Sequence, residues 1–201
     1  MSLFINKLLS SAVQIVLFTL VPFVWWLVTA RKKQNFFDWI GLKKPQGGKK
    51  TFLGTLIVAL IFLVFGAFTI YTLGNTENAT SDFAGLGIKA IPVVLVYAIL
   101  NTSLPEEILF RGFLLKRISN KFGFGVANVI QSLVFGIMHG VMFFSLVGIS
   151  KAILIIAFTS SIAWFMGYIN EKKANGSIIP SWTIHALSNI FSGLCAAFMI
   201  F

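Results

Sequence analysis

The sequence predicts an all-α fold, a polytopic membrane helical bundle with about six transmembrane segments plus one amphipathic or re-entrant helix. Three observations lead to this prediction. Only 11% of the 201 residues are charged, whereas soluble domains carry roughly 25%. Hydrophobic residues make up 57% of the chain, and the mean hydropathy is +0.90. The apolar residues gather in runs close to the ~20 residues that cross a bilayer, so too little polar surface remains to cover a water-soluble globule.

The net charge of +10 has an explanation other than nucleic-acid binding. The basic residues stand in short runs between the apolar segments, as the positive-inside rule describes, and not in a stripe on a folded domain. We therefore expect the lipid bilayer as a partner and no nucleic acid. The single cysteine, Cys195, excludes an internal disulfide and a multi-cysteine metal site. Its apolar neighbours indicate a small buried residue.

The expected membrane helices are bounded by polar or helix-breaking residues. A basic loop at 31–50 follows the first helix and contains Pro45-Gln46-Gly47-Gly48, which stops a helix. A polar loop without Lys or Arg follows the second helix, at 74–87. An amphipathic stretch that starts with Pro105 follows the third, at 105–121. The six apolar segments are 8–28, 52–73, 88–104, 124–142, 152–169 and 178–201.

The distribution of basic residues predicts the orientation. Loop 31–50 holds seven of the sixteen Lys and Arg residues, so we place it in the cytoplasm and loop 74–87 outside. If the later helices alternate, twelve of the sixteen basic residues lie on the cytoplasmic side. Two interpretations of 105–121 then stay open. It is a re-entrant helix, or it continues 88–104 as one long, broken helix.

Several ionisable side chains occur within the apolar helices, where each charge costs at least ~2.5–3.5 kcal/mol at the helix centre and usually has a function. Glu107 and Arg111 are four residues apart, so a helix brings them together as an ion pair. His185 and Asn189 have the same spacing and share one helix face. The full set of ionisable candidates is Glu106, Glu107, Arg111, His139 and His185.

Helix geometry predicts that these groups meet. A short turn centred between residues 122 and 123 should join two antiparallel helices. Glu106 and His139 are each 16 residues from that centre, so both stand ~24 Å from the turn. We expect their polar atoms to approach within one water, roughly 3–6 Å. His185 and Asn189, ~10 and ~17 Å along the last helix, would join them near mid-membrane if both basic turns share a surface.

Each of these residues also has a purely structural interpretation. Ser103 and Glu106 have the spacing of a capping box, with Ser103 as the N-cap, although this explains one carboxylate and not the one beside it. His139 alone is consistent with a core histidine. His185 with Asn189 is consistent with a hydrogen bond between membrane helices. The convergence of all these groups at one depth favours a functional site.

Three motifs resemble one known family. Glu106-Glu107-Ile108-Leu109-Phe110-Arg111-Gly112 resembles the E-E-x-x-x-R signature of the CPBP family (CAAX protease and bacteriocin processing, also called Abi), which includes the type II CAAX prenyl endopeptidases. Phe135-Gly136-Ile137-Met138-His139 resembles its F-x-x-x-H motif, and His185-Ala186-Leu187-Ser188-Asn189 its H-x-x-x-N motif. The chain is thus expected to be one integral membrane domain, 1–201, with generic N-terminal helices at 1–85 and a catalytic core at 86–201.

The resemblance implies an all-α intramembrane endopeptidase that hydrolyses a peptide bond of a membrane-associated peptide or protein. Glu106 and His139 would activate the water, and His185 and Asn189 would stabilise the oxyanion. The supporting residues would be Glu107 and Arg111, which hold the helix and orient the site.

The cofactor stays open at this point. Glu106, His139 and His185 could supply three ligands to Zn²⁺ and leave one position free. The chain has no H-E-x-x-H motif, and the carboxylate–histidine mechanism needs no metal, so we favour the metal-free mechanism.

The substrate and two other functions also stay open. Candidate substrates are CAAX-like prenylated peptides, bacteriocin leaders and signalling peptides, and the expected location is the bacterial cell membrane. A non-proteolytic bacteriocin immunity or binding protein is one alternative. A proton- or cation-coupled transporter is the other, and the lack of an internal repeat disfavours it.

Overall fold

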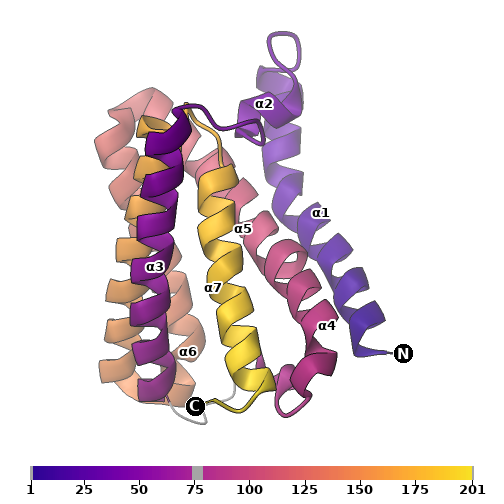
Figure 1. Ribbon diagram of the computed structural model, residues 1–201. Helices are drawn as coiled ribbons and strands as arrows, with labels where there is room; N and C mark the ends of the chain where they lie inside the picture. The colour runs from indigo at the N-terminus through magenta and orange to yellow at the C-terminus, as the bar shows by residue number, and fades with distance from the viewer. Residues whose placement is uncertain (1, 74–78, 201) are drawn as a thin grey trace.

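The computed structural model describes residues 2–73 and 79–200, and these ranges contain helices and turns but no strand (Figure 1). The all-α prediction is therefore confirmed. Three helices are long and apolar enough to cross a membrane, so the expected count of about six is not confirmed. In chain order the elements are α1 (Leu3–Thr29), α2 (Phe36–Ile40), α3 (Gly48–Leu73), η1 (Ser81–Phe83), η2 (Gly87–Ala90), α4 (Ile91–Val96), η3 (Tyr97–Ser103), α5 (Leu104–Glu107), η4 (Ile108–Leu115), α6 (Lys116–Lys172) and α7 (Ile179–Ala197).

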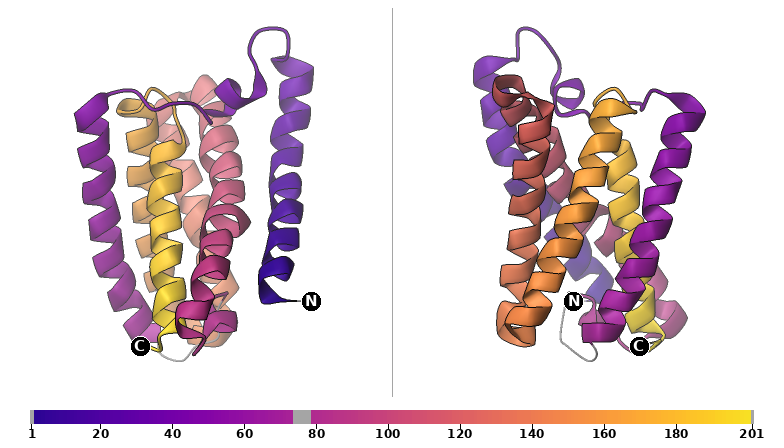
Figure 2. Two further views of the ribbon diagram at one scale, coloured as in Figure 1. Left: turned by 45° about the vertical axis from the view of Figure 1, so that its right-hand side comes forward. Right: turned by 90° about the vertical axis from the view of Figure 1, so that its left-hand side faces the viewer.

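The third of these long candidates, Gly87–Lys172, turns back on itself twice. The backbone leaves helical geometry at Gly123 (φ 79°, ψ 161°) and at Gly148 (φ 75°, ψ 175°). Glycine takes a positive φ without a Cβ clash, so it suits both turns. The two α6 segments that meet at Gly148 lie side by side in Figure 2. The turn expected near residues 122 and 123 is confirmed. The second turn, at Gly148, falls between the expected apolar segments 124–142 and 152–169, and both helices extend to it.

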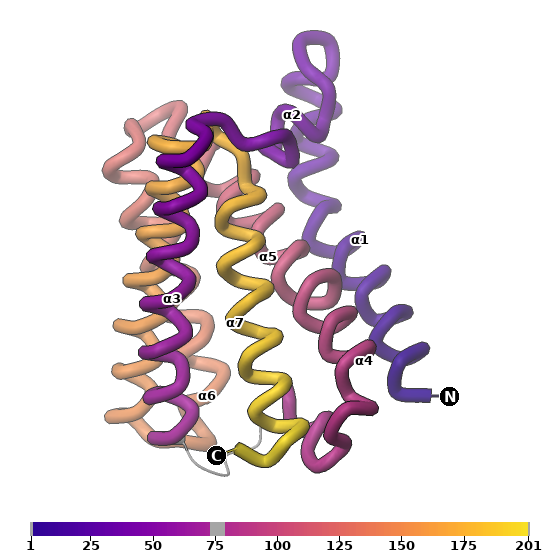
Figure 3. The backbone as a smooth tube through the Cα atoms, viewed as in Figure 1, coloured from indigo at the N-terminus to yellow at the C-terminus, as the bar shows by residue number. Residues whose placement is uncertain are grey.

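The helix that carries the first motif runs through Pro105 without a break (Figure 3). Ser103 has helical angles (φ −63°, ψ −49°) and makes no capping bond, so the expected capping box is wrong. Its hydroxyl instead donates to the carbonyl of Ala98 at 2.5 Å, and the Thr102 hydroxyl donates to Tyr97 O at 3.2 Å. The backbone of η3 and η4 is π-helical, and such wider turns are often found at functional sites. The re-entrant alternative is therefore wrong, and one long helix is formed.

Hydrogen bonds between distant segments hold one end of the molecule together. The Thr51 hydroxyl, at the start of α3, donates to Lys173 O at 2.6 Å. The Lys116 ammonium donates to Gly176 O and to a Glu171 carboxylate oxygen, both at 2.7 Å. The segments around residues 41–51, 116 and 171–178 therefore share this end, which also carries α2 (Figure 1).

The net charge of the chain belongs to this same end. Its segments at 31–50, 116–121 and 172–173 contain twelve Lys and Arg residues. The only acidic residues beside them in the sequence are Asp38 and Glu171, so this end carries the full net charge of +10. We call it the basic end.

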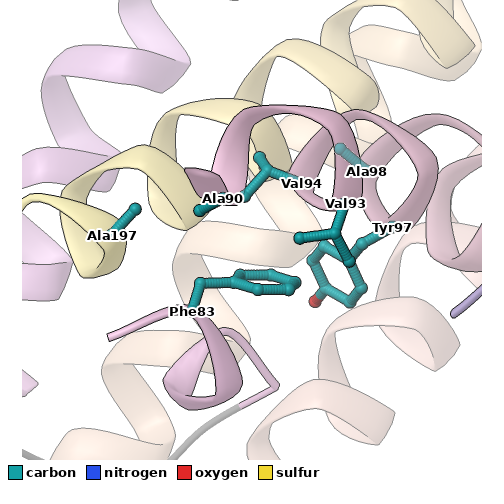
Figure 4. Close-up of a cluster of buried hydrophobic side chains, with 7 residues drawn as sticks. All are labelled: Phe83, Ala90, Val93, Val94, Tyr97, Ala98 and Ala197. Carbon is teal, nitrogen blue, oxygen red and sulfur yellow. The ribbon is translucent and has the colours of Figure 1, made fainter. Parts of the chain in front are cut away.

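Among the described residues, the opposite end is held by apolar side chains and by the ion pair of Lys7 with Asp82. Phe83 of η1 and Ala90 of η2 pack with side chains of α4 and with Ala197 at the end of α7, as Figure 4 shows. Lys7 of α1 pairs with Asp82 at 2.9 Å and so ties α1 to η1. The buried cluster consists of Phe83, Ala90, Val93, Val94, Tyr97, Ala98 and Ala197.

The orientation of the basic end can be tested by cysteine labelling in a Cys195→Ala background. We predict that Lys44→Cys is not labelled by a membrane-impermeant maleimide in intact cells, because the positive-inside rule places the basic end in the cytoplasm. Ala79→Cys, at the other end, should react. Both positions are exposed, so both should react after detergent permeabilisation. Labelling of Lys44→Cys and protection of Ala79→Cys in intact cells would invert the topology.

Candidate active site

The first motif places a buried ion pair between helices. Glu107 Oε1 lies 2.9 Å from Arg111 Nη1, and both side chains are fully buried, which confirms the predicted pairing. The Arg111 guanidinium lies 4.2 Å from the ring centre of Phe135, and its Nη2 is 3.8 Å from Met166 Sδ. The pair therefore connects the motif helix to both long segments of α6.

His185 of α7 lies against both glutamates. Its Nδ1 is 3.1 Å from Glu107 Oε1, and its Nε2 is 3.8 Å from Glu106 Oε2. The Glu106 side chain is 20% exposed, and its Oε2 atom is buried with no hydrogen-bond partner in the part of the chain that the structure describes. Glu107 Oε2 also has no partner there, but neighbouring residues on a helix point in different directions, so Glu107 faces the ion pair and Glu106 faces the Nε2 side of His185.

His139 is held in one tautomer by its own helix. Its Nδ1 lies 2.8 Å from the carbonyl oxygen of Phe135, one turn earlier. A carbonyl oxygen only accepts hydrogen bonds, so Nδ1 carries the hydrogen, and Nε2 of the neutral ring keeps its lone pair. The Phe135 ring centre is 4.4 Å from that of His139 and 5.9 Å from that of His185. Phe135 therefore packs against Arg111, His139 and His185, three of the residues predicted from the sequence.

Asn189 is oriented by the π-helical segment. Its Nδ2 donates to Thr102 Oγ1 at 2.7 Å and, more weakly, to Ser103 Oγ at 3.3 Å. Sequence reasoning did not identify Thr102 and assigned Ser103 to a cap. Their position directly before the first motif was the only available signal, and it did not show that they meet α7.

A cavity of about 180 Å³ adjoins these groups. The helix α6 contributes His139 to its lining, and α7 contributes His185 and Asn189. Glu106 is not part of that lining and meets the cavity through His185. The helix α3 also lines the cavity, with Phe62, Gly66, Thr69 and Ile70. The sequence indicates only generic membrane helices at 1–85 and does not predict this contribution.

Two motif glycines allow close packing. A Cβ on Gly112 would lie 2.8 Å from Ile40 O, so the glycine lets α2 approach the motif helix. A Cβ on Gly136 would lie 2.7 Å from Ile156 O, where the two long segments of α6 cross. Small residues at such contacts bring membrane helices together. The two glycines therefore allow the close helix packing that positions Glu107, Arg111 and His139 for the contacts described above.

The arrangement does not match the zinc site considered from the sequence. Among residues 2–73 and 79–200, no three His, Cys, Asp or Glu side chains are grouped as metal ligands. Nδ1 of His139 is engaged by a carbonyl, and Nδ1 of His185 by Glu107. Only Nε2 of each ring could reach an ion, and these atoms do not converge with Glu106 as a ligand set.

Comparison with known families assigns the chain to a class. The family model "Type II CAAX prenyl endopeptidase Rce1-like" matches residues 88–191, which is more than half of the chain and includes all three motifs. The chain therefore belongs to this family. Membership implies a CAAX-type protease, and the apolar helices indicate an integral membrane protein that would act on a membrane-associated peptide. Comparisons with curated proteins and with solved structures gave no match.

The ion pair leads to a stability prediction. Arg111→Ala leaves Glu107 buried without its cation, which typically costs about 3–5 kcal/mol. We therefore expect a lower folded yield and a lower melting temperature in detergent. Arg117→Ala is the matched control, because Arg117 lies 4.0 Å over the Trp39 ring nearer the basic end and a partly buried contact of this kind contributes about 0.5–2 kcal/mol. Equal melting of Arg111→Ala and the unmodified protein would contradict a stabilising pair.

Proposed function

We propose that this chain is an intramembrane endopeptidase in which Glu106 and His139 activate the water that hydrolyses a peptide bond of a membrane-associated substrate. One observation carries the proposal. His185 lies between the two carboxylates of the first motif and also lines the cavity that His139 and Asn189 line. All four proposed catalytic residues thus belong to one connected group.

The water-activating pair is supported by two free acceptors. Glu106 Oε2 has no partner within the described ranges, and Nε2 of neutral His139 has its lone pair available. A general base must reach the proton that it removes directly or through one water. Glu107 Oε2 also lacks a partner, but the Glu107 side chain is fully buried and its charge is offset by Arg111, whereas the Glu106 side chain is 20% exposed and has no ion pair with Arg or Lys among the described residues. Glu106 is therefore the proposed carboxylate base.

His185 and Asn189 are the proposed oxyanion donors. Nδ1 of His185 faces a carboxylate and donates to it, so Nε2 can donate to an oxyanion only when the ring is protonated. Its Nε2 lies on the side of Glu106, at 3.8 Å from Oε2, and Nδ1 lies 3.1 Å from Glu107 Oε1. Asn189 holds one N–H on Thr102 at 2.7 Å. The same nitrogen makes a weaker 3.3 Å contact to Ser103, and its other N–H is the one proposed to donate to the transition state.

We also propose that the chain crosses the membrane about six times. The turns at Gly123 and Gly148 divide the longest candidate into three helices, and each of these is long enough to cross. The helix α7 has 19 residues, or about 28 Å, and packs among them. With α1 and α3 these make six.

The division of roles predicts different losses for two substitutions. Glu106→Gln should abolish cleavage of a membrane-anchored peptide in proteoliposomes, because the amide keeps the shape but is no base. Asn189→Ala removes one oxyanion donor, which typically lowers kcat by about 10²–10³, so measurable activity should remain.

Folding and metal controls separate the alternatives for this experiment. Gel filtration and melting should match the unmodified protein for both variants. Substantial cleavage by Glu106→Gln would show that Glu106 is structural and would refute the assignment. Loss of activity with a chelator and its recovery with Zn²⁺ would instead make Glu106, His139 and His185 metal ligands.

A further inference from the structure

One side of the catalytic cavity comes from outside the family-matched segment. The family model covers residues 88–191, whereas α3 spans Gly48–Leu73. Phe62, Gly66, Thr69 and Ile70 of α3 nevertheless line the same cavity as His139, His185 and Asn189. Their spacing of four, seven and eight residues from Phe62 places them on one helix face. The matched segment thus supplies the catalytic groups, and α3 supplies the opposing surface.

The size and lining of the cavity limit what it can hold. Its volume of about 180 Å³ is below the roughly 300–1,000 Å³ of pockets for drug-sized ligands. The lining opposite the polar groups includes Phe62, Ile70 and Phe158, which offer no charge to a ligand. Thr69 and Thr159 also line it, but their hydroxyls donate to carbonyls of their own helices, so this side of the cavity favours one apolar side chain over a polar or charged group, whose desolvation would be only partly offset there.

We propose that α3 determines the substrate selectivity of this enzyme. The cavity takes a single large apolar side chain of the substrate, from a residue next to the bond that is cut, and Gly66 leaves the room for it. This inference rests on the proposed endopeptidase function. It assigns specificity to a helix that carries none of the three motifs.

Gly66 is the position where this idea can be tested with least disturbance. A Cβ on Gly66 would meet no atom within 4 Å, yet the residue lines the cavity. A Cβ at 66 therefore meets open space beside the cavity, and we expect a leucine side chain there to take up part of its volume. Gly54 offers a matched control in the same helix, because its Cβ would also meet nothing within 4 Å and it does not line this cavity. Leucine favours helix over glycine at both positions, so folding should not suffer.

The experiment compares Gly66→Leu and Gly54→Leu on paired peptides. The two peptides are membrane-anchored, identical in length and charge, and differ only in Leu or Ala beside the cleaved bond. We expect the unmodified enzyme and Gly54→Leu to prefer the Leu peptide. Filling the pocket should lower kcat/KM for the Leu peptide by about 10–100-fold, the range for methylene-sized differences in a pocket, and change the Ala peptide by less than threefold. Equal losses on both peptides, or no loss on either, would overturn the proposal.

A binding measurement separates this inference from the proposed function. Fluorescently labelled Leu and Ala peptides are titrated onto Glu106→Gln protein in nanodiscs, with and without Gly66→Leu. Tighter binding of the Leu peptide that disappears with Gly66→Leu supports the pocket even if no cleavage is ever seen, in which case only the endopeptidase assignment fails. Cleavage by the unmodified protein without any Leu preference, in rate or in binding, refutes the pocket and leaves the endopeptidase intact.

Discussion

The buried Glu107–Arg111 ion pair is the interaction on which the rest of this structure depends. Both side chains are fully buried, and two charges withdrawn from water need close partners to offset their desolvation. Arg111 finds further contacts on Phe135 and Met166, and Glu107 accepts from His185. The charge pair can therefore be stable only when the motif helix, α6 and α7 are all in place. The helix packing that stabilises this ion pair is thus the same packing that assembles the candidate site.

The π-helical segments explain how one helix supplies two carboxylates and a proline within the membrane. Backbone carbonyls without a donor are costly in lipid. Hydroxyls of Thr102 and Ser103 and the Trp182 indole donate to the carbonyls of Tyr97, Ala98 and Ile99, at the start of the π-helical segment before Pro105. The same two hydroxyls accept from Asn189. The groups that satisfy the irregular backbone therefore also orient a proposed oxyanion donor.

Local spacing predicted part of this arrangement from the sequence, and non-local packing accounts for the rest. The Glu107–Arg111 pair and the turn at Gly123 follow from helix periodicity and glycine, so both could be foreseen. The capping box at Ser103 could not be distinguished from a π-helical turn, because the same hydroxyl can bond forward or backward along the chain. The position of His185 between two glutamates depends on how α7 packs. The part of α3 in the cavity left no signal, since its side chains there are ordinary membrane residues.

The concentration of charge at the basic end has an electrical consequence. Moving one charge through 100 mV takes about 2.3 kcal/mol, so inverting an end with a net charge of +10 against a membrane potential of that size would take about 23 kcal/mol. A polarised cell membrane therefore fixes the orientation once the chain is inserted. Vesicles without a potential exert no such force during reconstitution, and they should contain molecules of both orientations. A peptide added from outside reaches only the enzyme molecules whose site is accessible from that side. Cleavage rates should therefore be divided by the number of those molecules and not by the total amount of enzyme.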